Sequence, residues 1–347
     1  MRFLFHCRNT TGLGHLMRGR NIAREIRKIA PSAEILFTGN DKSVVSLSGE
    51  FPYAPDLNFE NLAFFRPDVV VFDTLFPEWT KTQVPASNIR MVYVMRKIRP
   101  ERRDDFFGHP LFARMDLILI PHTREDFSDG LPVCVQQRTF WVGPIVREIN
   151  LQVQRSLCEK YKIGKEDFVV TSTVGGGGKK NQSRAFFEIV STLHKRLYPV
   201  LPNLRHFAVL GPYSPICLDA QDGMTLLQFE PEMQNLFALS SLVIGEGGYN
   251  TVQEVRLAKT PAVFLPSLRL LDNQEERVRP LEKKGLCAVF TEGSPDYVAG
   301  KILEICLSKS RLDEMKTNYL QDHFETGNLA AAKKILELAN SSIGMGI

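Results

Sequence analysis

Residues 242–254 read LVIGEGGYNTVQE, and this stretch indicates the fold class of the whole chain. An apolar run at residues 242–244 is followed by glycines and then by a predicted helix. A buried strand that turns through glycines into a helix is typical of an open α/β sheet. Ligands bind such sheets beyond the carboxyl ends of the strands, where a helix presents free N–H groups. We therefore expect a ligand-binding loop here.

Glu254 lies inside this predicted helix, about one to two turns beyond the glycines. When a phosphate occupies the start of the helix, a carboxylate at that position reaches a ribose diol and accepts both hydroxyl hydrogens. A surface glutamate on the flank of the helix is the alternative. The stretch alone favours that alternative.

Short apolar runs alternate with amphipathic stretches from end to end, which predicts parallel strands joined by helices. The predicted strands form two series, at residues 3–7, 35–38, 69–72, 91–95, 117–120 and 140–142, and at residues 168–174, 207–210, 226–229, 242–244, 262–265 and 288–291. Two terminal helices are predicted at residues 295–308 and 311–338.

At roughly 100 to 200 residues per domain, 347 residues predict two domains. We expect an α/β protein with two Rossmann-like, doubly wound domains that face a cleft. The predicted domains are residues 1–145 and 146–325, followed by a C-terminal helix or tail, residues 326–347. One arrangement open to this tail is that it crosses back and packs on the first domain.

The composition excludes several other classes of protein. With 44% hydrophobic and 24% charged residues the chain is neither disordered nor fibrous, and a net charge of +4 does not require nucleic acid as a partner. The six cysteines show no C-x-x-C spacing and the seven histidines no H-x-x-x-H pair, which argues against structural zinc. No apolar stretch approaches the ~20 residues of a membrane span, and the N-terminus lacks a secretory leader, so we expect a cytoplasmic protein.

Residues 10–18, TTGLGHLMR, follow the first predicted strand. Gly12 and Gly14 allow a tight turn and a close approach of the backbone to a ligand, so both are candidate residues for binding a nucleotide sugar. His15 begins the next helix, where the positive field favours a neutral imidazole. A neutral imidazole can take a proton from a hydroxyl or from water. An ordinary turn with a capping histidine explains this spacing equally well.

Asp73 follows the predicted strand 69–72, so its carboxylate lies at the carboxyl end of a strand. It is a second candidate catalytic residue, which would orient His15 or bind the acceptor. Capping of the turn at residues 74–77 is at least as well supported.

A basic run, Arg96, Lys97, Arg99, Arg102 and Arg103, follows the predicted strand 91–95. We interpret it as a solvated loop. The alternative is that these side chains bind an anionic or lipid-linked acceptor.

Residues 174–181, VGGGGKKN, follow the first strand of the second series. Four glycines, Gly175 to Gly178, and the lysines that follow them suit a phosphate cradle, because they precede an amphipathic helix. A flexible linker is the alternative. The loop lacks the Walker Gly-Lys-Ser/Thr ending, so the sequence does not indicate a P-loop NTPase.

Residues 227–233 (LQFEPEM), 247–254 (GGYNTVQE) and 261–266 (PAVFLP), with Asp272-Asn273-Gln274, resemble the donor domain of GT-B glycosyltransferases, and most closely the peptidoglycan-type N-acetylglucosaminyltransferases. The resemblance implies that Glu254 binds the ribose and that Phe229 meets the uracil edge. It also implies that Arg147 marks the entry to the cleft. The remaining implied donor contacts are Gly247, Gly248, Asn250 and Thr251 at the diphosphate, Gly175, Gly176, Gly177, Gly178, Lys179 and Asn181 in the other diphosphate loop, and Asn273 and Gln274 at the sugar.

The first loop departs from the peptidoglycan-type pattern, because its glycines alternate as G-x-G-H-x-x-R from Gly12 to Arg18. This form resembles predicted spore-coat glycosyltransferases and the UDP-sugar hydrolase of pseudaminic acid synthesis, relatives in which the histidine serves catalysis. The acceptor therefore stays open, and water is among the options.

Together these resemblances imply a metal-independent, inverting glycosyltransferase of the hexosyltransferase type that takes a UDP-type nucleotide sugar as co-substrate and needs no cofactor. Main-chain N–H groups would stabilise the departing diphosphate and His15 would deprotonate the acceptor. The acceptor is either lipid-linked or a small molecule, and a peripheral place at the inner membrane face goes with the first option. The alternatives are a UDP-sugar hydrolase, a nucleotide-sugar 2-epimerase and a non-catalytic nucleotide-sugar-binding subunit.

Overall fold

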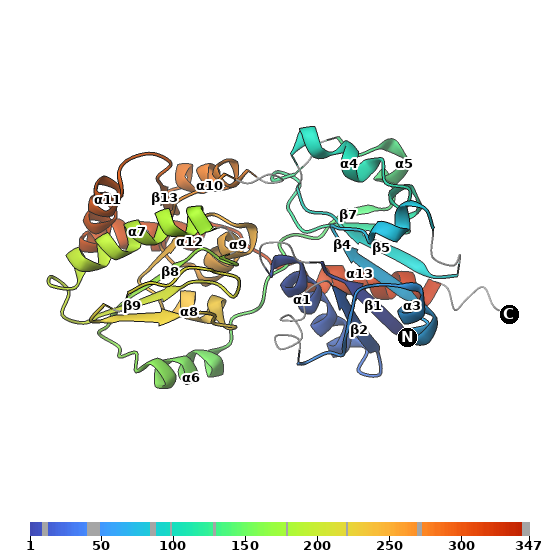
Figure 1. The fold of residues 1–347 in the computed structure, drawn as a ribbon, viewed down its shortest axis with the longest axis horizontal. Helices are drawn as coiled ribbons and strands as arrows, with labels where there is room; N and C mark the ends of the chain where they lie inside the picture. Colours follow the sequence, from blue (N-terminus) through green and yellow to red (C-terminus); the bar gives the residue numbers. More distant parts are fainter. Residues whose placement is uncertain are drawn as a thin grey trace. The chain divides into compact units, whose positions relative to one another are not determined.

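The structure is a computed structural model of residues 1–347. It describes the chain apart from residues 9–12, 40–48, 84–87, 98, 128–129, 178–179, 220, 269–272 and 342–347. The chain divides into two compact units, one formed by Met1–Val146 with Glu325–Ile347 and the other by Arg147–Phe324 (Figure 1). Each unit contains one parallel sheet with helices on both faces.

The sheet of the first unit has the strand order β3-β2-β1-β4-β5-β6-β7, and every neighbouring pair is parallel. The order reverses between β1 and β4, so the loops after these two strands lie side by side. The strands are β1 (Arg2–His6), β2 (Glu34–Gly39), β3 (Tyr53–Pro55), β4 (Val69–Asp73), β5 (Arg90–Val94), β6 (Leu117–Ile120) and β7 (Thr139–Trp141). The helices are α1 (Gly14–Ile29), α3 (Phe59–Phe65), α4 (Asp104–Phe107), α5 (Val133–Gln136) and α13 (Asn328–Ser341).

Helix α1 lies close against the sheet because its buried face contains a glycine. A Cβ atom at Gly19 would lie only 2.6 Å from the Sγ atom of Cys7, so no other residue fits there without a shift. Strand β4 is buried along its whole length, as expected of a continuous apolar run with a covered face on each side. This packing fixes the start of α1 beside the end of β4.

The C-terminal segment is joined to the first unit by a buried amide. The Asn328 side chain accepts the Val146 N–H (3.1 Å) and donates to the Val146 carbonyl oxygen (2.6 Å), and Gly327 N–H donates to the Pro144 carbonyl (2.6 Å). The prediction of one helix at residues 311–338 was wrong, because α12 (Lys309–Gln321) and α13 are separate helices. The chain leaves the second unit between them.

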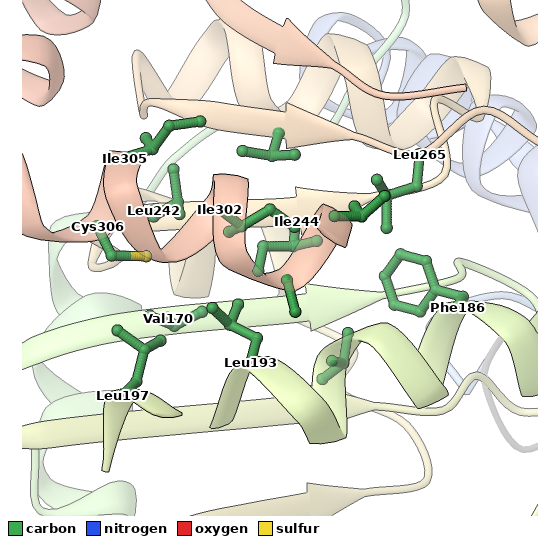
Figure 2. Packing of buried hydrophobic residues seen from close by; sticks show 14 of the residues in the cluster. Val170, Phe186, Leu193, Leu197, Leu242, Ile244, Leu265, Ile302, Ile305 and Cys306 are labelled. Atoms are coloured by element: carbon green, nitrogen blue, oxygen red, sulfur yellow. The ribbon is translucent and has the colours of Figure 1, made fainter. Parts of the chain in front are cut away.

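The sheet of the second unit has the order β10-β9-β8-β11-β12-β13 and is also parallel throughout. Its core on one face lies between the sheet and two helices, α7 and α11, as Figure 2 shows. The strands are β8 (Phe168–Thr173), β9 (Leu204–Val209), β10 (Met224–Leu227), β11 (Leu242–Gly245), β12 (Ala262–Phe264) and β13 (Cys287–Val289). The helices are α6 (Leu151–Tyr161), α7 (Lys180–Leu197), α8 (Met233–Ala238), α9 (Tyr249–Ala258), α10 (Gln274–Lys283), α11 (Pro295–Leu307) and α12.

All twelve strands predicted from the sequence are present, with ends that differ by up to three residues. Strand β3 was not predicted. Among the described residues, no helix has the length and apolar character needed to cross a membrane.

A buried chain of hydrogen bonds in the second unit accommodates two neutral histidines. His194 Nε2 donates to the Asp222 carbonyl (2.9 Å), which only accepts, so in its neutral form His194 accepts at Nδ1 from His206 Nδ1 (3.2 Å). His206 Nε2 then accepts from the Ser172 hydroxyl (2.8 Å). Burial, with a smaller effect of His194, lowers the pKa of His206 to about 3.

Acid is therefore expected to destabilise this unit. Below pH 6.5 the unfolded chain binds a proton at His206 that the folded unit binds only near pH 3, so stability is lost as the pH falls through this window. The loss at pH 5 should be about 2 kcal/mol. Thermal unfolding of the wild type and of His206→Gln from pH 7 to pH 4.5 measures it. The variant should show the shallower fall, and equal slopes would contradict the assignment.

Candidate functional site

The loops after β8 and β11 meet at the carboxyl edge of the second sheet. The two strands pair in register, with Thr173 opposite Gly245. A Cβ atom at Gly175 would lie 3.8 Å from Thr251 Oγ1, so the glycine loop lies directly beside the first turn of α9. Gly175 and Gly177 have φ of 67° and 73°, in the left-handed region that favours glycine. The two glycine loops that the sequence indicated therefore converge.

Helix α9 begins without a side-chain cap. Gly248 is the N-cap and provides no side-chain acceptor, and the first turn contains no acidic residue. A Cβ atom at Gly248 would meet no atom within 4 Å, so the space before the helix is open. Uncapped N–H groups at a helix start, together with the helix dipole, favour an anion. Gly247 (φ 84°), Asn250 and Thr251 lie at the same turn.

Glu254 lies one turn further along α9, with a half-buried side chain. Its carboxyl group makes no hydrogen bond or ion pair with the described part of the chain. Burial raises the pKa of Glu254 to about 8, and the charge of Arg147 acts in the opposite direction. A partly desolvated carboxyl group gains free energy when the hydroxyl groups of a ligand donate hydrogen bonds to it.

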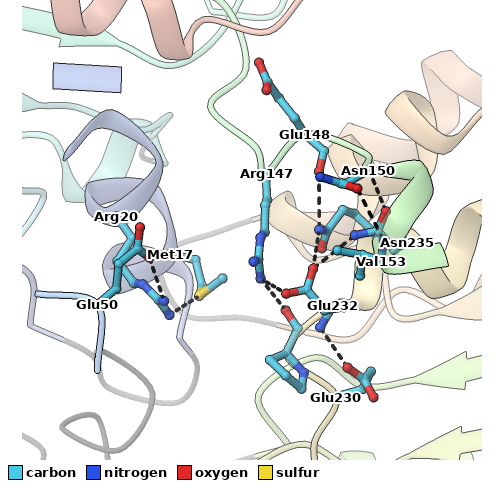
Figure 3. A network of polar contacts seen from close by, with 12 residues as sticks. Met17, Arg20, Glu50, Arg147, Glu148, Asn150, Val153, Glu230, Glu232 and Asn235 are labelled. Carbon is cyan, nitrogen blue, oxygen red and sulfur yellow. Dashed lines mark hydrogen bonds and ion pairs between the residues drawn. The ribbon is translucent and has the colours of Figure 1, made fainter. Parts of the chain in front are cut away.

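Arg147 holds the loop that follows β10. Its guanidinium donates to the Pro231 carbonyl (3.1 Å) and pairs with Glu232 Oε1 (2.5 Å), as Figure 3 shows. Glu232 N–H in turn donates to the buried carboxylate of Glu230 (3.0 Å). Phe229, which is half-buried, belongs to this loop. The network fixes the loop that the sequence assigned to the base, and it brings the Arg147 charge within range of Glu254.

The sequence analysis missed the loop after β9. Tyr213 N–H donates to the Gly176 carbonyl (3.0 Å), and Gln228 Nε2 donates to the Gly211 carbonyl (2.7 Å). These bonds connect the loops after β8, β9 and β10 at one edge. A glycine directly after the predicted strand 207–210 was the signal that could have identified this loop.

The two residues assigned to the donor sugar have structural partners. Asn273 is the N-cap of α10 and accepts the Glu276 N–H (3.2 Å). The buried Gln274 accepts the Ser267 N–H through Oε1 (2.9 Å), and its Cβ lies 3.6 Å from the Cβ position of Gly247. Gln274 is therefore at the α9 turn, and its amide N–H₂ group makes no hydrogen bond to the described residues. Asn181 is exposed in the first turn of α7.

Three of the predicted residues, Gly12, Gly178 and Lys179, lie outside the described residues. Gly14 is the first residue of α1.

His15 and Asp73 meet in the first unit, although they are far apart in sequence. His15 Nδ1 lies 2.6 Å from Asp73 Oδ1, and both side chains are buried. The carboxylate only accepts, so Nδ1 carries the proton and Nε2 is the free basic nitrogen. His15 Nε2 makes no hydrogen bond to any described residue. This geometry fits a general base that is oriented by a carboxylate.

Burial, together with two neighbouring arginines, keeps His15 neutral. Burial opposes ionisation of Asp73, but Arg18 and His15 hold the pKa of Asp73 well below its usual range. Burial lowers the pKa of His15, Asp73 opposes this, and the charges of Arg18 and Arg96 lower it further. The imidazole is thus ready to accept a proton at neutral pH. Within the described ranges, no group of three His, Cys, Asp or Glu side chains is arranged to hold a metal ion.

Residues 213–335 match the glycosyltransferase family 28 C-terminal domain, and this segment includes α9 and Glu254. The chain is also similar to a UDP-N-acetylglucosamine–N-acetylmuramyl-(pentapeptide) pyrophosphoryl-undecaprenol N-acetylglucosamine transferase of Symbiobacterium thermophilum. The two are 23% identical over 369 residues, which cover 95% of this chain and 94% of the relative. A transferase of the same name from Rickettsia bellii is 26% identical over 230 residues, 62% of this chain, and there the chain spans only 60% of the relative's length.

Solved structures with different activities share the fold. The spinosyn forosaminyltransferase has a TM-score of 0.64 at 15% identity, with 98% of this chain and 99% of that chain covered. The UDP-GlcNAc 2-epimerase of Neisseria meningitidis has a TM-score of 0.63 at 13% identity, with 98% and 100% covered. These likenesses confirm the predicted GT-B fold with two Rossmann-like domains. The resemblance to peptidoglycan-type transferases is confirmed as well.

Proposed function

We propose that this chain is a glycosyltransferase on the GT-B fold that transfers a sugar from a UDP-type donor to an acceptor hydroxyl, without a metal ion and with inversion at the anomeric carbon. The observation that carries the proposal is the convergence of the Gly175 loop with the first turn of α9, next to the Glu254 carboxyl, which has no partner among the described residues. Together they provide donors for a diphosphate and an acceptor for a ribose.

In this proposal, main-chain contacts to the diphosphate take the place of a metal ion. As the bond between the sugar and the diphosphate breaks, negative charge grows on the β-phosphate oxygen. The N–H groups at the start of α9 are fixed dipoles directed at that charge, and they need no rearrangement during the reaction. Among the described residues, the site presents no carboxylate cluster of the kind that holds Mg²⁺.

His15 is the proposed base. Its free Nε2 takes the proton of the acceptor hydroxyl while the oxygen attacks the anomeric carbon opposite the leaving diphosphate. A single in-line displacement inverts the configuration. Asp73 stabilises the resulting imidazolium through Nδ1–H, as in other base–carboxylate pairs.

The names of the two relatives, which include a pyrophosphoryl-undecaprenol acceptor, support a lipid-linked acceptor for this chain too. A small-molecule acceptor remains the competing proposal, because the acceptor-side loop has the G-x-G-H-x-x-R form. The chemistry at His15 is the same in both cases.

Ligand-induced thermal stabilisation tests the donor. UDP should raise the melting temperature of the wild type more than ADP, GDP or dTDP at equal concentration, since a ligand at 100 times its Kd stabilises by about 2.7 kcal/mol. The UDP effect should persist in EDTA. Equal responses to all four nucleotides would count against a UDP-type donor, and loss of the response in EDTA against metal independence.

The reaction itself is tested with UDP-sugars and a panel of lipid-linked and soluble acceptors. The NMR coupling of the anomeric proton in the product reports its configuration, which should be opposite to that of the donor. Retained configuration would exclude the single displacement. Fast release of free sugar without any acceptor would identify a hydrolase instead.

A further inference from the structure

Arg18 is a buried guanidinium that neither the donor site nor the proposed base explains. It lies one turn beyond His15 on α1 and is 2% exposed. Its Nε donates to Asp73 Oδ2 (2.8 Å) and its Nη2 to Asp73 Oδ1 (2.5 Å). A buried ion pair often contributes little net stability, because desolvation of the two charges offsets their attraction. Its place beside His15 suggests a role in the reaction.

The contact of Arg18 with both carboxylate oxygens determines the orientation and the charge of Asp73. Oδ1 also accepts from His15 Nδ1 (2.6 Å) and from the Thr74 hydroxyl (3.1 Å). A planar guanidinium that binds both oxygens fixes the plane of the carboxylate, which a lysine with its single charged nitrogen cannot do. It also keeps Asp73 ionised, so this carboxylate does not take the proton from His15.

We propose that Arg18 is a positioning residue of the proposed transfer reaction, which locks Asp73 in the orientation that leaves His15 Nε2 unprotonated and directed to the acceptor hydroxyl. The inference rests on the proposed function. In the reaction, the proton of the hydroxyl moves to Nε2, the hydroxyl oxygen forms the bond to the anomeric carbon, and the electrons of the broken bond go to the diphosphate. Arg18 keeps its own protons throughout.

The charges that face His15 come from three elements. Asp73, at the end of β4, favours the imidazolium, whereas Arg18 on α1 and Arg96 after β5 oppose it. The neighbouring Cys7 after β1 and Tyr93 on β5 stay neutral, because burial raises the pKa of both groups. Removal of the Arg18 charge therefore leaves Asp73 with His15 as its main cation, so His15 should become easier to protonate.

The test is the pH dependence of transfer in Arg18→Gln and Arg18→Lys. In Arg18→Gln the acid limb of the kcat/KM profile should move up by about one pH unit or more, so at a pH below the wild-type limb the activity falls about tenfold more than the activity at pH 8.5. Arg18→Lys keeps the charge, so its acid limb should stay near that of the wild type while kcat falls at every pH. A purely structural role would lower the Arg18→Gln rate equally at all pH values, and that result would overturn the proposal.

A second measurement does not depend on activity. The NMR titration of the His15 ring protons, assigned with His15→Ala, should show a higher midpoint in Arg18→Gln than in the wild type. An unchanged midpoint would overturn the proposal even if no acceptor is found. Absence of transfer in the wild type, with the midpoint raised as expected, would instead overturn the proposed function alone.

Two further variants separate the effect from misfolding. Arg20→Lys is the matched control, since Arg20 lies on the same helix and pairs with Glu50 (3.2 Å) instead of Asp73 (Figure 3). It should leave the pH profile unchanged. If Arg18→Gln does not fold, Arg18→Gln combined with Asp73→Asn removes both buried charges at once. The His15 midpoint of this double variant should be no higher than that of the wild type, and a clearly higher midpoint would contradict the role of Arg18.

Discussion

Replacement of His15 by alanine is expected to lower kcat by about 10²- to 10⁴-fold, the usual contribution of a general base. The affinity for UDP should stay unchanged, because Glu254, Phe229 and the glycine loops after β8 and β11, which are proposed to bind UDP, belong to the other unit. Steady-state kinetics and calorimetric titration with UDP measure the two quantities separately. Equal loss of UDP affinity and of kcat would contradict the role of His15 as a base.

Asp73→Asn tests whether the two residues act as a unit. Asp73 is proposed to act through the hydrogen bond to His15 Nδ1. The double variant His15→Ala with Asp73→Asn should therefore have a kcat no lower than that of His15→Ala alone. Multiplied losses would mean that they act independently. His109→Asn is a suitable control, because His109 lies outside the pair and the new amide oxygen can still accept the Leu111 N–H. It should retain near wild-type kcat.

Glu254→Ala should weaken UDP binding by about 10- to 100-fold, since hydrogen bonds to a charged group contribute about 1.5–3 kcal/mol. Binding of 2′,3′-dideoxy-UDP should be weak in the wild type and nearly unaffected by the substitution. Comparing the affinities of UDP and 2′,3′-dideoxy-UDP in the wild type and in Glu254→Ala isolates the contact between Glu254 and the ribose. Equal losses for both nucleotides would place Glu254 away from the ribose. Glu304→Gln, an exposed glutamate paired with Lys301, is the control.

Glu254 should also make donor binding pH-dependent. With a pKa of about 8 in the free protein, Glu254 is mostly protonated at pH 7, and the ionised form is the better acceptor for two hydroxyl groups. Binding should then release a proton, and UDP affinity should rise between pH 6 and pH 8. Calorimetry in buffers of different ionisation enthalpy measures the proton. Glu254→Gln should lose the part of the pH dependence that comes from this group.

Much of the architecture could be predicted from local patterns. Each buried parallel strand is a short apolar run, and each ligand loop has glycines where the chain turns into a helix, so β4, β8 and β11 were recognisable. Strand β3, Tyr53–Pro55, was missed because it is a three-residue edge strand that ends in proline, and its side chains are not buried. The break between α12 and α13 was missed because the helical spacing continues on both sides of it.

The sequence alone determined the type of fold, the position of the two glycine loops and the likeness to GT-B transferases, because burial periodicity and glycine turns are local properties of the chain. It named His15 and Asp73 without deciding whether they meet. Only the tertiary structure decided that, through the pairing of β1 with β4, and it alone showed that Arg18 occupies both oxygens of the carboxylate. Strand order and side-chain direction depend on contacts between residues that are distant in the sequence, and such contacts cannot be inferred from local sequence patterns.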